Sequence, residues 1–258
     1  MEASIANAEA MLQQEVAYAT SDYFSYVVDC TGSTNSSGDH YYPTINPVDV
    51  HCRKKMVDWC FQVVHYANFC RDTVFIALNF LDRYCQSDSG LVALHDSEMF
   101  RLTVLTSLYM AIKIHEPVAL NTKFITYLSR GQFSALDVEA TERKMLFALQ
   151  WRLNPPTPLA FCRLFLDFLE DKHIFDFNAV AKEVVNDLAV VETEIATLDY
   201  NFISTKPSMI AFTSVLSALD RSGFNKSDIA YAAHTLTKIT GINYKCEGVC
   251  DDIHNLKD

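Results

Sequence analysis

The stretch RKKMVDWCFQVVHYANFCRDTVFIALNFLD, residues 53–82, has the apolar spacing of two consecutive amphipathic helices. Arg53 stands near the start of the first helix and Asp82 near the end of the second. If the two helices pack antiparallel, these ends come together and the guanidinium can meet the carboxylate. Spacing alone favours the simpler interpretation, in which the helices are amphipathic and the two charges are solvated and unrelated.

The composition indicates a folded, mainly helical protein. The chain has 258 residues, of which half are hydrophobic, so it can form one large domain or two domains of about 100–130 residues. Only 7 glycines and 7 prolines are present, which argues against a turn-rich β fold. The chain is therefore expected to be all-α.

Charge and cysteine usage restrict the partners and the compartment. The net charge of −11 disfavours nucleic acid and acidic membrane surfaces as main partners, because both attract clustered Lys and Arg. The N-terminus MEASIANAEA lacks the apolar core of a secretory signal, and no apolar run reaches the length of a membrane span. We therefore expect the 8 cysteines to be reduced in a soluble intracellular protein.

Helical patterns continue on both sides of the opening pair. Residues 4–24 predict an N-terminal helix with an apolar stripe, followed by a polar loop at 30–47. Residues 97–113 are apolar nearly all round, as in a helix at the centre of a bundle. A short segment at 124–128 and a helix at 134–149, opened by a Ser134/Asp137 capping box, complete five helices.

A proline-rich boundary separates the two halves of the chain. Pro155 and Pro156 prevent the continuation of a helix, and Thr157 can cap a new helix with Pro158 at its first position. Beyond this boundary, helical segments are predicted at about 158–169, 178–198, 207–221 and 227–240, with a short one near 246–255.

Several of these segments resemble the cyclin family. Arg53 followed by Met-Val-Asp-Trp at 56–59, and then Ala-Leu-Asn-Phe-Leu-Asp-Arg-Tyr at 77–84, is similar to the start of a cyclin box. The sequence VEATERKMLFALQWRL at 138–153 aligns without gaps with the fifth helix of that family. The resemblance implies two tandem five-helix domains preceded by an N-terminal helix. In that family such a helix packs on the first domain and contacts the cyclin-dependent kinase that the cyclin binds.

The resemblance also implies domain limits and a structural ion pair. The N-terminal helix and loop would occupy residues 1–46, the N-terminal cyclin box 47–154 and a C-terminal cyclin-like domain 155–258. Arg53 and Asp82 would form the buried ion pair between the first two helices of the box.

Lys113 and Glu142 are the strongest candidates for a binding site. Taken alone, each is interpreted as a solvated charge, although a lysine at the end of an apolar helix must snorkel or find an acceptor. In the cyclin family, a lysine and a glutamate at these places bind main-chain groups beside the C-helix of the kinase. The resemblance adds an apolar contact made by four further residues: Met110, Ile114, Leu146 and Leu153.

Two departures from the family pattern are visible. The acidic residues that usually follow the lysine are replaced, so that only Glu116 matches. Many cyclins also carry a groove that docks Arg-x-Leu substrates, and its positions hold Cys52, Lys55, Met56, Trp59 and Arg101. Lys55 puts a charge where that groove is usually aliphatic, so a degenerate groove is expected.

The resemblance therefore predicts a noncatalytic regulatory subunit that binds a cyclin-dependent kinase as a heterodimer and activates it in cell-cycle control. Protein substrates of the kinase are possible further partners, and no catalytic residue, cofactor or metal is expected. The short segment before the box favours a D-type or other G1-like cyclin over a mitotic type. The expected location is the nucleus and cytoplasm.

Three alternatives stay open at this point. A transcription factor or scaffold with the same helical repeat would bind DNA or non-kinase partners. Cys246, Cys250 and His254 share one face of a short helix, as zinc ligands can, but no fourth ligand or Cys-x-x-Cys accompanies them. An enzyme built on Lys113 as a desolvated amine would need catalytic partners, and the sequence supplies none.

Overall fold

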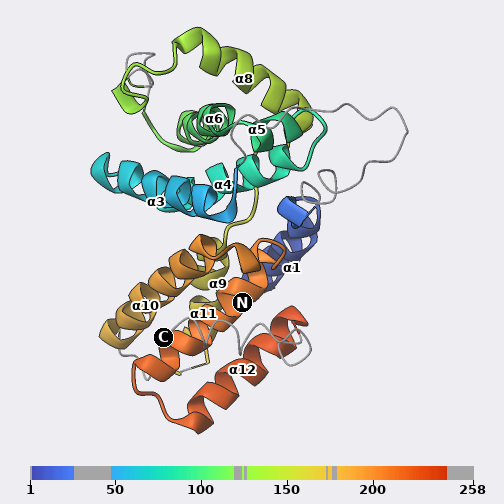
Figure 1. Ribbon diagram of the computed structural model, residues 1–258. Coiled ribbons are helices and arrows are strands. Elements are labelled where there is room, and N and C mark those ends of the chain that lie inside the picture. Colours follow the sequence, from blue (N-terminus) through green and yellow to red (C-terminus); the bar gives the residue numbers. More distant parts are fainter. Residues whose placement is uncertain are drawn as a thin grey trace. The chain divides into compact units, whose positions relative to one another are not determined.

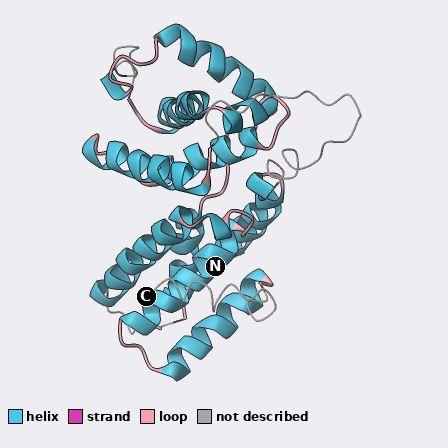
Figure 2. Cartoon of the chain, viewed as in Figure 1, coloured by secondary structure: helices cyan, strands magenta, loops and turns pink. Residues whose placement is uncertain are grey.

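The computed structural model describes residues 2–25, 48–118, 124, 127–172, 174–175 and 179–242. The chain divides into two compact units (Figure 1). One, here called the N-unit, comprises residues 20–155; the other, the C-unit, combines residues 1–19 with residues 156–258. The described residues form ten α-helices and one 3₁₀ helix and no strand (Figure 2), which confirms the all-α prediction.

The N-unit is built around α6, Ser97–His115. This helix contacts four others in the unit: α3 (Val50–Tyr66), α4 (Asp72–Cys85), α5 (Leu91–His95) and α8 (Ala135–Ala148). Its apolar sequence accounts for this position, because most of its side chains are buried. The predicted central helix is thus confirmed.

Two short segments of the N-unit do not simply match the prediction: one was not predicted, and the other lies largely outside the described residues. Helix α5 was not predicted, because five residues are too few to establish a helical period. The segment predicted at 124–128 lies largely outside the described residues, which there include only Phe124, Tyr127 and Leu128.

Side-chain caps fix where several helices begin. Asp96 accepts a hydrogen bond from the amide of Glu98 at the start of α6. Ser134 and Asp137 form the predicted capping box at the start of α8. Thr157 caps α9 (Pro158–Glu170), which begins with Pro158, as the sequence indicated.

The C-unit is organised around α11, Pro207–Arg221. This helix contacts α9, α10 (Ala179–Leu198) and α12 (Lys226–Thr240), and the 3₁₀ helix η1 (Tyr200–Phe202) follows α10. Phe161, Phe165 and Phe212 lie fully buried in its core. Four predicted helices are confirmed here, and the one predicted near 246–255 lies outside the described residues.

Helix α1, Glu2–Val16, belongs to the C-unit. Its Ala8 is buried in the core of that unit, against which Ile5, Met11 and Leu12 also pack. The expectation of a helix over 4–24 packed on the first domain is therefore wrong in extent and in place. The apolar stripe also ends early, since Val16 is 67% exposed.

A buried carboxylate fastens α1 to α11. Glu15 is 4% exposed, and its oxygens accept hydrogen bonds from the Ser208 amide at 3.1 Å and the Ser208 hydroxyl at 2.8 Å. Lys206, the N-cap residue of α11, makes no capping bond with its own side chain. A residue of α1 thus supplies the cap that α11 lacks, placing negative charge at a helix N-terminus, where it is favourable.

Among the helices described, none is both long and apolar enough to cross a membrane.

Candidate functional site

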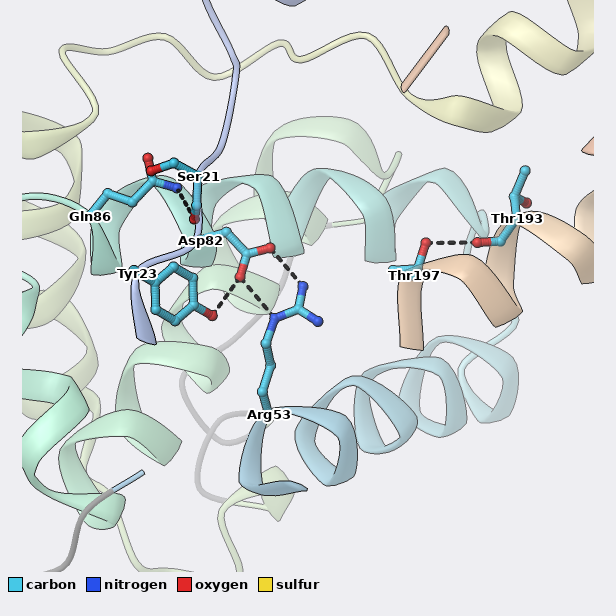
Figure 3. Close-up of polar contacts among 7 residues, drawn as sticks. All are labelled: Ser21, Tyr23, Arg53, Asp82, Gln86, Thr193 and Thr197. Atoms are coloured by element: carbon cyan, nitrogen blue, oxygen red, sulfur yellow. Dashed lines mark hydrogen bonds and ion pairs between the residues drawn. The ribbon is translucent and has the colours of Figure 1, made fainter. Parts of the chain in front are cut away.

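Arg53 and Asp82 form a buried, forked ion pair inside the N-unit (Figure 3). Arg53 Nε lies 3.0 Å from Asp82 Oδ1, and Arg53 Nη2 lies 2.7 Å from Asp82 Oδ2. The two residues are only 4% and 5% exposed. Burial by itself lowers the pKa of Arg53, but Asp82 and Tyr23 together outweigh this effect and keep the pKa above its ordinary value. Arg53 therefore stays charged, and its bonds to Asp82 join α3 to α4.

Tyr23 completes this buried cluster. Its hydroxyl donates to Asp82 Oδ1 at 2.9 Å, and the residue is 1% exposed. Close by, the side-chain amide of Gln86 donates to the carbonyl of Ser21 at 3.4 Å (Figure 3). Residues 21–23 are therefore held against the C-terminal end of α4 within the N-unit. Sequence reasoning missed Tyr23, because no periodic pattern connects it to α3 or α4.

Lys113 and Glu142 meet at the surface of the N-unit. Lys113 Nζ, at the end of α6, lies 3.0 and 3.3 Å from the two carboxylate oxygens of Glu142 on α8. The lysine side chain is 51% exposed and the glutamate side chain 14%. Lys113 Nζ also lies 5.4 Å from the ring centroid of Tyr109.

The protonation of Lys113 argues against an amine nucleophile. Its hydrogen bond to Glu142 raises the pKa, and this gain exceeds the opposing effect of partial burial. A nucleophilic lysine needs the opposite, a pKa depressed toward neutrality. The enzyme alternative based on Lys113 is therefore disfavoured by the structure.

An open hollow of about 640 Å³ surrounds the pair. Its lining includes four charged residues, Lys113, Glu139, Glu142 and Arg143, and five apolar residues, Ile114, Leu146, Phe147, Trp151 and Leu153. This surface, defined by these nine residues, is called the α6–α8 face below. Of the predicted contact residues, Met110 is absent because it is 0% exposed. The prediction that Met110 contributes to a surface contact is therefore wrong, because Met110 is buried in the core of the N-unit.

Two exposed aromatic residues of this face were not predicted. Phe147 is 69% exposed and Trp151 is 63% exposed. From sequence alone, apolar residues near the end of a helix are usually assigned to the core. The contact residues inferred from the cyclin resemblance did not include Phe147 or Trp151. Their exposure beside a charged pair is the feature that singles them out.

The chain turns sharply where Trp151 is presented. Helix α8 ends at Ala148, and Gln150 and Trp151 then adopt left-handed backbone angles, with φ of 54° and 58°. Such a conformation costs roughly 1–2 kcal/mol for each residue that is not glycine. Its persistence at two successive residues requires compensating contacts from the surroundings.

Side chains from α4 and α6 provide those contacts. Arg83 donates from Nη2 to the Leu149 carbonyl at 3.1 Å and from Nη1 to the Arg152 carbonyl at 2.9 Å. His115 Nε2 lies 3.0 Å from the Leu153 carbonyl oxygen. Three backbone acceptors of the turn are therefore bound by two side chains of the same unit.

Glu116, the one acidic residue that matches the family pattern after the lysine, is used internally. Its Oε1 accepts a hydrogen bond from the Cys70 amide at 2.8 Å and another from the Thr73 hydroxyl. These bonds connect the end of α6 with the start of α4. The residue therefore contributes to the shape of the N-unit.

A second, smaller pocket corresponds in part to the expected substrate-docking groove. Met56, Trp59 and Arg101 line a volume of about 230 Å³, together with Leu105, Leu128, Ser129, Arg130, Gln132 and Phe133. Cys52 and Lys55 are not among its lining residues. The structure thus brings together three of the five residues named for this groove, and the charge of Lys55 lies outside the pocket.

The described part of the chain contains no cluster of three or more His, Cys, Asp or Glu residues suited to a metal ion. The candidate ligands Cys246, Cys250 and His254 lie outside the described residues.

Comparison with protein families identifies both halves of the chain. The model of the cyclin N-terminal domain matches residues 22–154, and the model of the cyclin C-terminal domain matches residues 156–256. The two matches meet at the proline boundary.

Curated relatives include cyclins of different classes. A G2/mitotic-specific cyclin-2 of Antirrhinum majus is 29% identical over 76% of this chain and 41% of its own length. The G1/S-specific cyclin-D1 of Xenopus laevis is 26% identical over 77% of this chain and 64% of its own length. Cyclin-D3-3 of Arabidopsis thaliana is 28% identical, and the match covers 66% of this chain and 45% of that relative.

A solved structure shares the fold. The X-ray structure of a viral cyclin from herpesvirus saimiri has a TM-score of 0.66 with 16% identity, over 82% of this chain and 86% of that one.

Proposed function

Because this chain belongs to the cyclin family, we propose that it is a regulatory subunit that binds a cyclin-dependent kinase through the α6–α8 face and activates it. The chain spans between 37% and 64% of the length of four curated relatives that it matches, so the activity is proposed here on the basis of the surface of this chain. The observation that carries the proposal is the exposed Lys113–Glu142 pair set in an apolar surround.

The chemistry of the pair suits a protein backbone. Lys113 has three N–H donors and Glu142 has two acceptor oxygens, so their mutual bond leaves bonding capacity for a partner. Apolar neighbours such as Ile114 and Leu146 would exclude water around these bonds when a partner docks. Charged anchors within an apolar ring are the arrangement expected of a binding hot spot.

Activation would follow from selective binding. A cyclin that binds only the active arrangement of the kinase C-helix shifts the kinase population toward that arrangement. In the active state, a lysine and a glutamate of the kinase itself pair beside ATP. The present chain would supply binding energy and no catalytic group.

The test uses purified proteins. The wild type and a Lys113→Ala/Glu142→Ala double variant are each titrated with a panel of purified monomeric cyclin-dependent kinases, and phosphorylation of a histone substrate is measured. We expect the wild type to bind and activate at least one kinase, and the double variant to lose at least about tenfold in affinity.

The matched control is Lys182→Ala/Glu170→Ala, which removes an ion pair of the C-unit with a 2.6 Å Nζ–Oε2 distance. It should bind as the wild type does. Equal binding by the wild type and the Lys113/Glu142 variant would show that the kinase contacts another surface of the protein. Folded wild type that binds no kinase would favour a scaffold with non-kinase partners.

We further propose a location in the nucleus and cytoplasm, which imaging of a fluorescent fusion tests directly. The relatives named above include both G2/mitotic and D-type cyclins, so the G1-like subtype remains a prediction. Expression of the protein through a synchronised cell cycle tests it: accumulation before DNA replication supports the G1-like assignment, and accumulation at mitosis contradicts it.

A further inference from the structure

We propose that Arg83 is a positioning residue for the α6–α8 face: with His115, it holds the turn at residues 149–153 so that Trp151 stands ready to contact the kinase. This inference rests on the proposed function for the identity of the partner. The positioning of the turn rests on the structure of the N-unit alone.

The first step is the geometry of the bonds. The guanidinium of Arg83 binds two carbonyls three residues apart, those of Leu149 and Arg152, at 3.1 and 2.9 Å. Its Nη1 also lies 3.4 Å from the side-chain oxygen of Asn79, one helical turn earlier on α4. The arginine is thus held on its own helix while it bridges the turn.

The second step is the strain of the turn. Gln150 and Trp151 both have left-handed φ angles, a conformation that non-glycine residues adopt singly and rarely in succession. Local backbone bonds also hold this turn, such as that from the Trp151 amide to the Leu146 carbonyl at 3.1 Å. Removing Arg83 leaves the Leu149 and Arg152 carbonyls without this donor and allows the turn to relax.

The third step is what the turn presents. Trp151 in the turn is more than 60% exposed, as is Phe147 near the end of α8, and both line the hollow that contains Lys113 and Glu142. Large aromatic side chains with few rotatable bonds contribute strongly to protein interfaces. Exposing these apolar side chains to water costs free energy, and this free energy would be recovered when a docked partner buries them.

The choice of arginine has a geometric reason. A guanidinium offers several N–H groups in a rigid planar fork, whereas a lysine is a single point of charge on a flexible stem. A lysine at position 83 keeps the charge but lacks the rigid fork that bridges the two carbonyls. Arg83→Lys is therefore an informative companion to Arg83→Ala, and it guards against misfolding of the alanine variant.

The first experiment observes the turn without any partner. In the 258-residue chain with Trp59→Phe, Trp151 is the only tryptophan, because the chain has 2. We expect Arg83→Ala, and to a lesser degree Arg83→Lys, to lower the fluorescence anisotropy of Trp151 and to change its acrylamide quenching. Lys54→Ala, which removes an exposed charge of α3, is the control and should change neither. Unchanged Trp151 signals in both Arg83 variants would overturn the positioning role.

The second experiment is a double-mutant cycle in the wild-type background, using the kinase that binds most tightly in the purified panel. Arg83→Ala and Trp151→Ala should each weaken binding by about tenfold or more. Because Arg83 acts through the turn, the double variant should bind about as weakly as Trp151→Ala alone. Fully additive losses would show that Arg83 does not act through Trp151, and no loss with Trp151→Ala would remove the aromatic contact from the proposal.

The two experiments separate the two ways of failing. If no kinase binds the wild type, the proposed function and the contact role of Trp151 fall together, while the fluorescence result still decides whether Arg83 orders the turn. If a kinase binds but the fluorescence and the cycle are unaffected by Arg83, the proposed function stands and this inference is wrong.

Discussion

Residue 82 shows how a buried charge can stabilise this fold. Asp82 has two partners, the guanidinium of Arg53 and the hydroxyl of Tyr23. Breaking a buried pair by removing one ion is more costly than the pair itself is stabilising, because the other ion is left without compensation. The three side chains should therefore differ in a graded way when they are replaced.

We predict that Asp82→Ala lowers the free energy of unfolding of the N-unit by about 3–5 kcal/mol, because Arg53 stays buried and unpaired. Tyr23→Phe removes the hydrogen bond from the Tyr23 hydroxyl to the Asp82 carboxylate and should cost about 1.5–3 kcal/mol. Urea unfolding followed by tryptophan fluorescence measures both, since Trp59 and Trp151 lie in the N-unit. Tyr66→Phe, at an 84% exposed position, is the control. A Tyr23→Phe cost as small as that of the control would contradict a structural role for the hydroxyl.

At this scale the sequence predicted pairs that lie on recognisable helices. Arg53 with Asp82, and Lys113 with Glu142, could be named because each stands in a stretch that resembles the family. Tyr23 could not, since nothing in its neighbourhood indicates which helix it will meet. Met110 was misassigned because a resemblance specifies position along a helix, whereas exposure depends on the packing around it.

Several helices in this chain begin where a side chain replaces a missing backbone acceptor. The capping box of α8 is an example: the Ser134 amide and hydroxyl donate to Asp137 Oδ2 at 2.8 and 2.7 Å. These bonds hold the pKa of Asp137 below its ordinary value of 3.8. A carboxylate with a depressed pKa contributes stability above its ordinary pKa and loses it as the pH falls through the folded value.

We predict that Ser134→Ala lowers stability at neutral pH by roughly 0.5–2 kcal/mol, as loss of an N-cap does. It should also return the pKa of Asp137 toward 3.8. The difference in stability between wild type and variant should then shrink as the pH is lowered from about 5 to about 2. Urea titrations across this range measure it, and the Asp137 carboxyl can be followed by NMR. A difference that stays constant with pH would show that the box does not hold the carboxylate in its charged form.

The two hydrogen bonds that Ser208 donates to Glu15 lead to a second prediction at the scale of elements. Glu15→Ala should uncap α11 and loosen α1, with a loss of about 1–3 kcal/mol, because the buried amide and hydroxyl of Ser208 lose their acceptor. Hydrogen exchange should increase in α1 and in the first turn of α11. Glu9→Ala, an exposed carboxylate on the same helix, is the matched control. Equal exchange in both variants would exclude the capping role.

Elements with strong local signals were predictable, and those without were not. Capping residues and proline positions located the starts of α8 and α9 correctly. The apolar stripe of the N-terminal helix was sufficient to predict a helix, but such a stripe does not indicate which surface of the protein covers it. Its seat on α9, α11 and α12 depends on residues more than 140 positions later in the chain.

At the scale of the whole molecule, the C-unit is discontinuous in sequence. Residues 1–19 are separated from residues 156–258 by the entire N-unit. We predict that a fragment of residues 156–258 is unstable and binds the dye ANS, because the apolar seat of α1 is uncovered. Adding a peptide of residues 1–19 should suppress dye binding and raise helicity by circular dichroism. A peptide with Ala8→Asp and Leu12→Asp should fail, and equal rescue by both peptides would contradict the packing of α1.

The place of α1 also has a consequence for the synthesis of the protein. Ribosomes release α1 first and its seat on the C-unit last, with about 140 residues between the end of α1 and the start of α9. At about 5–20 residues per second, the first helix of that seat begins to appear roughly 7–30 seconds after the apolar stripe of α1. The N-unit can fold in that interval, while α1 waits as a nascent segment whose Ile5, Ala8, Met11 and Leu12 are available to chaperones. Translation speed through the N-unit thus sets how long the growing chain needs that protection.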